Sequence, residues 1–542
     1  MRSPALAIAW EFRQRYRWGL TAIAGYLVAL ATVKLLILAP AAPVDIERSL
    51  GMWFLVLAPL TAAFIFFLGV FSFGFAGDFA ARQSIYPARL FTLPVTTAAL
   101  AGWPMLYGAV AVASLWLATA LLALRPSGIH VPLLWPALFA AAFLAWIQAL
   151  TWMPYGLRGL RAIVLLLWLC AAEAAVLLAM QYRVTEPVMV AFLLPHLLVA
   201  WLAGRLAVAR ARRGDAPDWL GAFSRLGHAA NPPARRFASP ARAQLWFEWR
   251  RHGRSLPTLV GILLPFELAL LFIPDIPQAL VFLTLLAALC TPPFLAIFAA
   301  ATVRKPDPHA RESDGLTPFI ATRPLTSAAL IAARLKMSLG SALAAWALVL
   351  VAIPLALALS GTWPLVFARA REVSDGIGAP RAAVFLLLAF AGLLASTWKQ
   401  LVQSLCVGLT GRAWAVKASV GFGLALMCLI GPFARWMINS AGARAALWDA
   451  LPWIAAGLVC VKMSAAAWVA ARLCRSRLLS DRALVTGAAG WTAVVFALYG
   501  LLAWLTAGPL IPRYFLALVA ILAIPLARLS AAPLALAWNR HR

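Results

Sequence analysis

Long apolar runs separated by short polar breaks make up almost the whole chain of 542 residues. About 20 consecutive apolar residues are needed to cross a bilayer as a helix. Counted this way, the pattern predicts an all-α, polytopic membrane protein with about 14 transmembrane helices, six before residue 210 and eight after residue 254. The predicted spans cover residues 18–39, 51–76, 100–124, 131–155, 161–181, 188–209, 256–273, 278–303, 335–359, 381–409, 414–436, 452–473, 484–507 and 514–536.

Basic residues in the breaks predict the orientation of these helices. Inner loops of membrane proteins carry an excess of Lys and Arg. With a cytoplasmic N-terminus, the inner loops hold Arg82, Arg89, Arg158, Arg161, Arg304, Lys305, Arg311, Arg323, Arg412, Lys417, Arg472, Arg475, Arg477 and Arg482. The outer loops hold few basic residues. The exception is residues 360–380, where two Arg are offset by the acidic residues Glu372 and Asp375. We therefore expect both termini on the cytoplasmic side.

Composition agrees with the pattern and excludes other classes of protein. The chain is 64% hydrophobic and 12% charged, with a net charge of +28. Such a charge on a soluble protein indicates nucleic-acid binding, but here most basic residues lie in the short breaks that orient spans. We expect the lipid bilayer as a partner and no nucleic acid. The six Cys show no metal-ligand spacing, so we expect no metal site.

One long polar break divides the chain into two parts. Residues 210–254 hold ten Arg and three acidic residues, which predicts a basic cytoplasmic linker too short for a catalytic domain. The expected order is an amphipathic helix over 1–17, a first bundle over 18–209, the linker over 210–254, which ends in a second such helix, and a second bundle over 255–536.

Two short phrases occur once in each part, in the same order. "WEFRQRYRWGL" precedes the first span and "FEWRRHGRSLP" precedes the seventh; "TLPVTTAAL" and "TRPLTSAAL" follow two spans later. The distance from Glu11 to Thr92 is 81 residues, and from Glu248 to Thr322 it is 74 (92 − 11 and 322 − 248). Two marks in one order at near-equal spacing predict two related bundles.

The chemistry of each phrase predicts its local structure. Pro94 and Pro324 exclude the preceding residue from the α region, and Thr96 and Thr326 are suited to cap the helix that follows. In the first phrase one arc of a helical wheel collects apolar residues, which predicts a helix lying on the inner membrane surface. Those residues are Ala5, Ile8, Ala9, Phe12 and Tyr16.

With these motifs the chain resembles the permease subunit of ABC exporters, in the class whose halves carry six spans each. The resemblance covers about the first three spans of each half. It implies interface helices near 5–17 and 241–254 and coupling segments near 78–97 and 304–327, which dock on ATPase subunits. Carried over by position, the interface helices hold Glu11, Arg13, Arg17, Glu248, Arg250 and Arg254. The coupling segments hold Asp78, Arg82, Arg89, Thr92, Pro94, Thr96, Arg311, Glu312, Asp314, Thr322, Arg323, Pro324 and Thr326.

The chain departs from that family in two places. The family has a basic residue after the Thr-x-Pro phrase, and the second half offers Arg334 and Lys336 there. In the first half, Pro104 stands at the position aligned with Arg334. The second half also has two additional spans, near 484–536.

No Gly-Lys dipeptide occurs, so the chain has no P-loop and we expect no enzyme activity of its own. ATP and Mg²⁺ would bind the partner ATPase, with two copies for two coupling segments. The resemblance also implies the cytoplasmic (inner) membrane as the location.

Charged residues inside predicted spans mark a possible substrate path. Glu173, Glu267 and Lys462 lie near mid-bilayer, where a charge usually faces a partner or water. Two other functions stay open. Repeats and buried charges also occur in secondary transporters, and the pair Asp45 and Glu47 in the first outer loop could bind a divalent cation in a lipid-linked glycosyltransferase.

Overall fold

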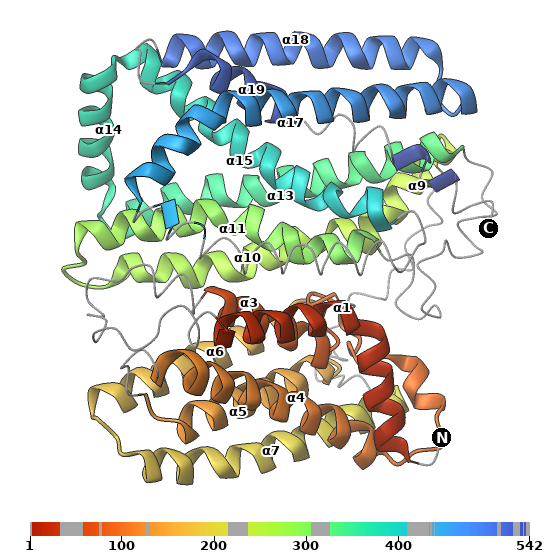
Figure 1. Ribbon diagram of the computed structural model, residues 1–542, viewed down its shortest axis with the longest axis vertical. Helices are drawn as coiled ribbons and strands as arrows, with labels where there is room; N and C mark the ends of the chain where they lie inside the picture. Colours follow the sequence, from red (N-terminus) through yellow and green to blue (C-terminus); the bar gives the residue numbers. More distant parts are fainter. Residues whose placement is uncertain are drawn as a thin grey trace. The chain divides into compact units, whose positions relative to one another are not determined.

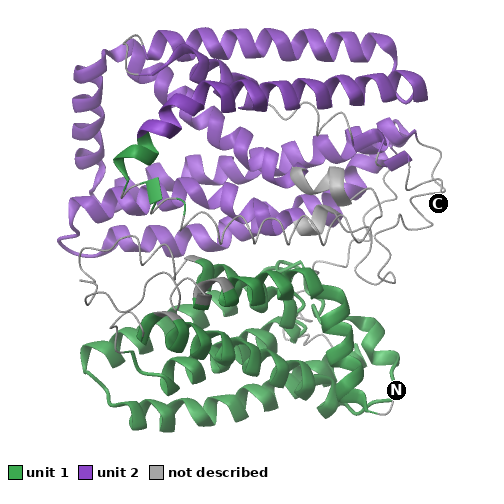
Figure 2. Ribbon diagram, viewed as in Figure 1, with its two compact units in different colours: residues 1–231, 413–444 green, residues 232–412, 445–542 purple. Residues whose placement is uncertain are grey.

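The computed structural model describes residues 3–32, 58–74, 78–125, 131–214, 237–304, 326–408, 440–506 and 511–523, with a few isolated residues elsewhere. These residues form helices and turns, with no strand among them. The chain divides into two compact units (Figure 2), Met1–Asn231 with Ala413–Arg444 and Pro232–Arg412 with Ala445–Arg542. The first boundary lies within the segment expected to be the linker.

The first unit is built around three helices that pack closely on one another. Its elements are α1 (Pro4–Thr32), α3 (Ala58–Phe71), the short 3₁₀ helix η5 (Ala88–Thr92), α4 (Thr97–Thr119), α5 (Leu134–Trp152), α6 (Leu160–Gln181) and α7 (Glu186–Arg213), as Figure 1 shows. Fully buried side chains such as Leu100, Leu144, Trp152 and Val208 come from α4, α5 and α7 and form its core. Helix α6, by contrast, has only Arg161 among its residues buried.

The second unit has its core between α10, α11, α13 and α15. Leu256, Val260 and Trp346 are buried there. Its elements are α9 (Pro240–Glu248), α10 (Ser255–Leu268), α11 (Gln278–Arg304), α13 (Ser327–Leu359), α14 (Trp363–Ile377), α15 (Ala379–Gly408), α17 (Ala441–Ser476, which begins among residues grouped with the first unit), α18 (Asp481–Leu505) and α19 (Arg513–Ala523).

Ten helices in the described part of the chain are long and apolar enough to cross a membrane. The protein is therefore a multi-pass, all-helical membrane protein. These ten helices coincide with ten of the predicted spans. The other four predicted spans, 18–39, 51–76, 414–436 and 514–536, lie partly or wholly outside the described residues.

Helix α14 was not expected, because residues 360–380 were interpreted as a loop between two spans. It has no buried residue, and Figure 1 shows it lying across the ends of α13 and α15. Trp363, Val366, Phe367, Ala370 and Ile377 recur at intervals of three, four and seven residues, which is the spacing of one helical face. That signal is present in the sequence, but the segment is too short and too polar to be predicted as a membrane span.

Pro104 interrupts α4 without leaving a carbonyl unpaired. A proline has no N–H, so the carbonyl of Leu100, four residues earlier, loses its helical donor. The Tyr86 hydroxyl donates to that carbonyl at 2.8 Å. Burial raises the pKa of Tyr86 far above its ordinary value, and the nearby Glu11 adds to the effect, so the hydroxyl keeps its proton at any working pH. The loop before α4 thus completes the helix that follows it.

Removing the Tyr86 hydroxyl should destabilise the protein most while Pro104 is present. We expect Tyr86→Phe to lower the free energy of unfolding by about 1–3 kcal/mol, the cost of a buried unpaired group. In a Pro104→Ala background the new N–H bonds the Leu100 carbonyl, so the same change should cost clearly less. Thermal unfolding in detergent, followed by far-UV circular dichroism, measures both. Equal costs in the two backgrounds would contradict this account.

Candidate coupling site at the membrane surface

The first interface helix forms the N-terminal part of α1, and its apolar arc packs against protein. Ile8 and Phe12 are buried in the core of the first unit. The arc expected to lie on the membrane surface therefore faces the protein core, where the Phe12 ring packs against the rings of Phe71 and Phe73. The side of α1 left exposed carries Leu6, Trp10 and Trp18. A break in helical geometry at Tyr16 (φ −115°, ψ 16°) separates this part from the rest of α1.

The loop over residues 78–93 is held by one buried guanidinium. Arg161, at the start of α6, is fully buried and donates to the backbone carbonyls of Asp78 (3.0 Å), Met153 (3.3 Å) and Gln83. The Asp78 carboxylate accepts from the Ala80 amide at 2.9 Å and lies 3.5 Å from the Arg158 guanidinium. One side chain therefore connects the loop before α4 with the turn between α5 and α6.

Backbone contacts join the same two segments. The Tyr155 amide donates to the Arg82 carbonyl at 2.9 Å, and the Gly159 amide to the Ala80 carbonyl at 3.0 Å. The Ser84 hydroxyl donates to the Trp152 carbonyl at 2.5 Å. Burial raises the pKa of Tyr155 to about 12, although the adjacent Arg161 lowers it, so its hydroxyl is neutral and donates to the Leu150 carbonyl. The two segments form one rigid surface.

Helix α1 is attached to this surface by a charge pair. Arg89, in η5, donates to the carboxylate of Glu11, and both side chains are about one third exposed (34% and 30%). At the start of the same helix, the Tyr107 hydroxyl of α4 donates to the Ala5 carbonyl at 2.9 Å. The interface helix therefore contacts both the loop and the helix that the loop introduces.

The Thr-x-Pro phrase has the predicted local structure in the first half. Leu93, before Pro94, is extended (φ −74°, ψ 140°), and the Thr96 hydroxyl accepts from the Ala99 amide at 3.3 Å, which confirms the helix cap. Thr92 bonds back to the Arg89 carbonyl at 2.8 Å. The side chains of Thr92, Leu93 and Pro94 are exposed, as is that of Arg82 earlier in the loop.

The second half has a buried version of the same charge pair. Glu248 of α9 lies 3.4 Å from Arg334 of α13, with only 2% and 6% of the two side chains exposed. The Gln244 amide donates to the same Glu248 oxygen at 2.9 Å. A π-helical segment over residues 249–253 follows and ends at Gly253. Gly253 aligns with Tyr16, where the helical geometry of α1 is broken, so the backbone is irregular at this place in both halves.

The two halves thus use aligned glutamates with non-aligned arginines. Arg334 aligns with Pro104, and Arg89 aligns with Phe319. Where a proline replaces the expected basic residue, an arginine from the preceding loop supplies the charge. Sequence comparison of the two phrases missed this exchange, because the alignment compares positions and not contacts.

The remaining expected residues of this site are placed as follows. The Thr326 hydroxyl accepts from the Ala329 amide at 3.1 Å, which confirms the second helix cap. Arg13 and Arg17 are exposed on α1, and the Arg17 guanidinium lies over the Trp18 ring. Arg250 lies over the Trp246 ring, and Arg254 stands at the start of α10. Outside the described residues lie Arg311, Glu312, Asp314, Thr322, Arg323 and Pro324, and also Asp45 and Glu47.

The three mid-span charges lie in different surroundings. Glu267 of α10 accepts from the Thr291 hydroxyl of α11 at 2.6 Å, and its second oxygen is buried with no hydrogen-bond partner among the described residues. Lys462 of α17 donates to the Ile521 carbonyl of α19. Glu173 is exposed on α6. Their contacts involve separate helices, so the described contacts do not join them into one path.

The sequence matches no protein-family model, and comparisons with curated proteins and with solved structures find no significant match. The resemblance to ABC exporter permeases therefore rests on the doubled motifs and their spacing.

Neutralising the buried glutamate should cost far more stability than neutralising the exposed one. Glu248→Gln leaves Arg334 buried without its counter-charge, and breaking a buried pair costs about 3–5 kcal/mol. Glu11→Gln affects a pair that is partly exposed to water, and such pairs contribute about 0–1 kcal/mol. Chemical unfolding of the purified variants in detergent would measure the difference.

The matched control removes both charges of the buried pair. Glu248→Leu with Arg334→Met leaves no uncompensated charge, so it should recover much of the stability lost in Glu248→Gln. Equal losses for Glu248→Gln and Glu11→Gln, or no recovery in the double variant, would contradict the buried pair.

Proposed function

We propose that the protein is the membrane-spanning permease of an ATP-driven transporter of the exporter type. ATP hydrolysis, with its Mg²⁺, takes place on separate ABC ATPase subunits, two copies of which dock at the cytoplasmic face of the inner membrane. The cargo is a hydrophobic or amphipathic molecule, because the helices offer mostly aliphatic and aromatic side chains and few polar groups. The chain itself is no enzyme and binds no cofactor.

The observation that carries the proposal is the doubled contact between a surface helix and the segment around each Thr-x-Pro phrase. Glu11 joins α1 to Arg89, three residues before the first phrase, and Glu248 joins α9 to Arg334, just after the second. A permease driven by a separate ATPase subunit needs rigid surface elements that transmit the movement of the ATPase to its transmembrane helices. A surface helix tied by a charged contact to the start of a span meets that need.

The anchoring of residues 78–93 adds mechanical support. Arg161 ties the loop to the start of α6 and to the turn after α5, while Thr96 makes the loop continuous with α4. A force applied at the exposed Leu93 would therefore be transmitted to α4, α5 and α6 together. A loop that served only to connect α3 with α4 would not need so many contacts to α5 and α6.

Inside the membrane, Glu267 is our candidate for a group on the substrate path. One of its oxygens has no hydrogen-bond partner among the described residues, and a buried carboxyl oxygen is costly to leave unpaired. Glu173 and Lys462 remain further candidates, Glu173 because it is exposed and Lys462 because it contacts α19.

The test measures how many ATPase subunits bind each chain. The tagged full chain is purified in mild detergent from membranes of the cells that produce it naturally, and any Walker-type ATPase that co-purifies is quantified. We expect two copies per chain for the native protein. Arg82→Glu with Leu93→Asp, both exposed, should reduce this to one copy, and adding Thr322→Asp with Arg323→Glu should remove the second.

The matched control places the same charges on the opposite side of the membrane. Arg183 and Val184 lie in the turn between α6 and α7, and Arg183→Glu with Val184→Asp should keep both ATPase copies. Absence of any ATPase from the native preparation, or equal losses in the docking and control variants, would refute the proposal. Size-exclusion profiles show whether each variant is folded.

A further inference from the structure

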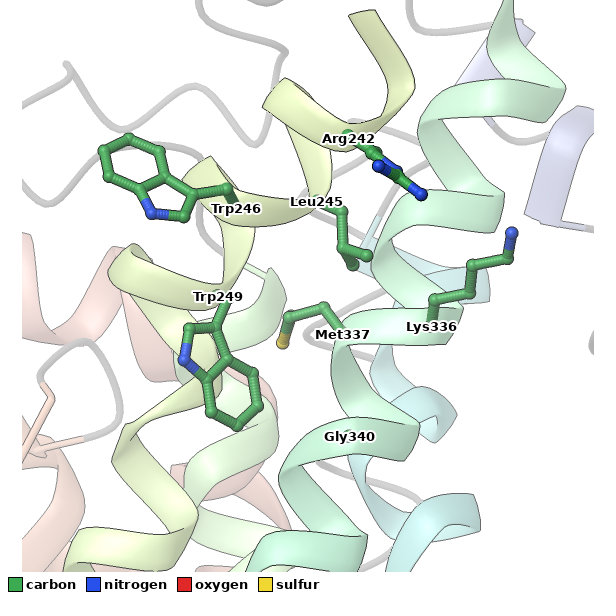
Figure 3. A pocket seen from close by; sticks show the side chains of 7 residues that line it. All are labelled: Arg242, Leu245, Trp246, Trp249, Lys336, Met337 and Gly340. Carbon is green, nitrogen blue, oxygen red and sulfur yellow. The ribbon is translucent and has the colours of Figure 1, made fainter. Parts of the chain in front are cut away.

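A pocket of about 300 Å³ lies between α9 and α13, next to the buried charge pair of the second unit. Figure 3 shows its walls, formed by Arg242, Leu245, Trp246, Trp249, Lys336, Met337 and Gly340. The cationic groups of Arg242 and Lys336 lie toward one edge, and the Trp249 ring and the Met337 side chain line the other part. The pocket is therefore amphipathic, with a basic edge and an apolar floor.

The basic edge has no acidic partner in the described part of the chain. No acidic residue lines the pocket, and the acid of α9, Glu248, already pairs with Arg334. In the described part of the chain, neither Arg242 nor Lys336 takes part in an ion pair. Two adjacent cations without an acid attract an anionic ligand, and the attraction is stronger beside an apolar wall than in bulk water.

The position of the pocket along α13 corresponds to the depth of lipid headgroups. Helix α13 has 33 residues, so it is about 50 Å long and exceeds the hydrocarbon thickness of about 30 Å. Lys336 is its last charged residue, and residues 337–359 are an uninterrupted uncharged stretch. Trp246 and Trp249 lie at the same level, where tryptophan is favoured in membrane proteins.

We propose that this pocket binds one anionic phospholipid from the leaflet at this end of α13. With the orientation predicted from the basic loops, this is the cytoplasmic leaflet. The lipid phosphate lies between Arg242 and Lys336, and the first part of an acyl chain covers Trp249 and Met337. Basic pockets beside transmembrane helices on the cytoplasmic side are suited to such headgroups. A soluble phosphate would leave the apolar floor exposed, and a zwitterionic lipid would leave the two cations uncompensated.

Gly340 keeps the floor of the pocket open. A Cβ at this position would lie 3.5 Å from the Trp249 ring, an ordinary contact, so a small side chain fits without strain. A leucine would extend further and occupy the space that we assign to the acyl chain. The residue therefore offers a way to close the pocket without changing its charge.

The experiment titrates the purified full chain in detergent with phosphatidylglycerol and with phosphatidylcholine of the same acyl chains, and measures bound lipid by native mass spectrometry. We expect tighter binding of the first phosphatidylglycerol than of phosphatidylcholine. Arg242→Gln with Lys336→Gln should weaken the first phosphatidylglycerol site on the order of ten-fold. Gly340→Leu should weaken it as well, while Gly340→Ala should have little effect.

The matched control removes two other basic residues from the same side of the membrane. Arg475 and Arg482 are exposed near the turn between α17 and α18, and Arg475→Gln with Arg482→Gln should leave the first site unchanged. Equal weakening in this control, or no weakening in the pocket variant, would overturn the proposal. Displacement of the lipid by soluble glycerol phosphate would also overturn it, since phosphate alone would then suffice. The proposal does not depend on the presence of an ATPase partner.

Discussion

Buried backbone groups at the ends of helices must find a partner within the protein, and this constraint shapes the first unit. The turn after α5, the start of α6 and the loop before α4 meet in a small region where several carbonyls have no helical donor. Arg161 satisfies three of them with one guanidinium. The conformation of the loop, its contact with α1 and the exposure of Leu93 all depend on this arrangement.

The same requirement explains how α4 tolerates a proline. The Tyr86 hydroxyl donates to the Leu100 carbonyl in place of the missing N–H of Pro104. The Tyr86 ring packs edge-on against the Trp152 ring, with centroids 5.2 Å apart. Trp152 in turn donates to the Ser72 carbonyl at the end of α3. Loop, helix α4 and helix α5 are thus joined by side chains that each satisfy a backbone group and fill the core.

The two halves share one contact, a glutamate paired with an arginine, but the arginines do not stand at aligned positions. Each interface helix has a glutamate at the same place, and each glutamate faces an arginine, but the arginines come from different segments. The second pair is buried and the first is partly exposed, so the same contact has a different energetic role in each half. A buried pair stabilises only while both charges are present, whereas an exposed pair can be broken and remade at low cost. The second interface helix also borders the basic pocket, and the first half has Ala5 at the position aligned with Arg242, so it lacks that basic residue.

The sequence alone determined that this is an all-helical membrane protein, where ten of its spans lie, and that Thr96 and Thr326 begin helices. Those features follow from local properties, since span length, proline geometry and capping each involve neighbouring residues. It also showed that Glu11 and Glu248 correspond. Only the tertiary structure decided what those glutamates contact, that Arg161 holds the loop, and that Ile8 and Phe12 face protein. These depend on groups far apart in the chain: Glu11 and Arg89 are separated by 78 residues, and Glu248 and Arg334 by 86. No periodic pattern encodes such pairs, because side chains from separate helices meet only after the helices have packed.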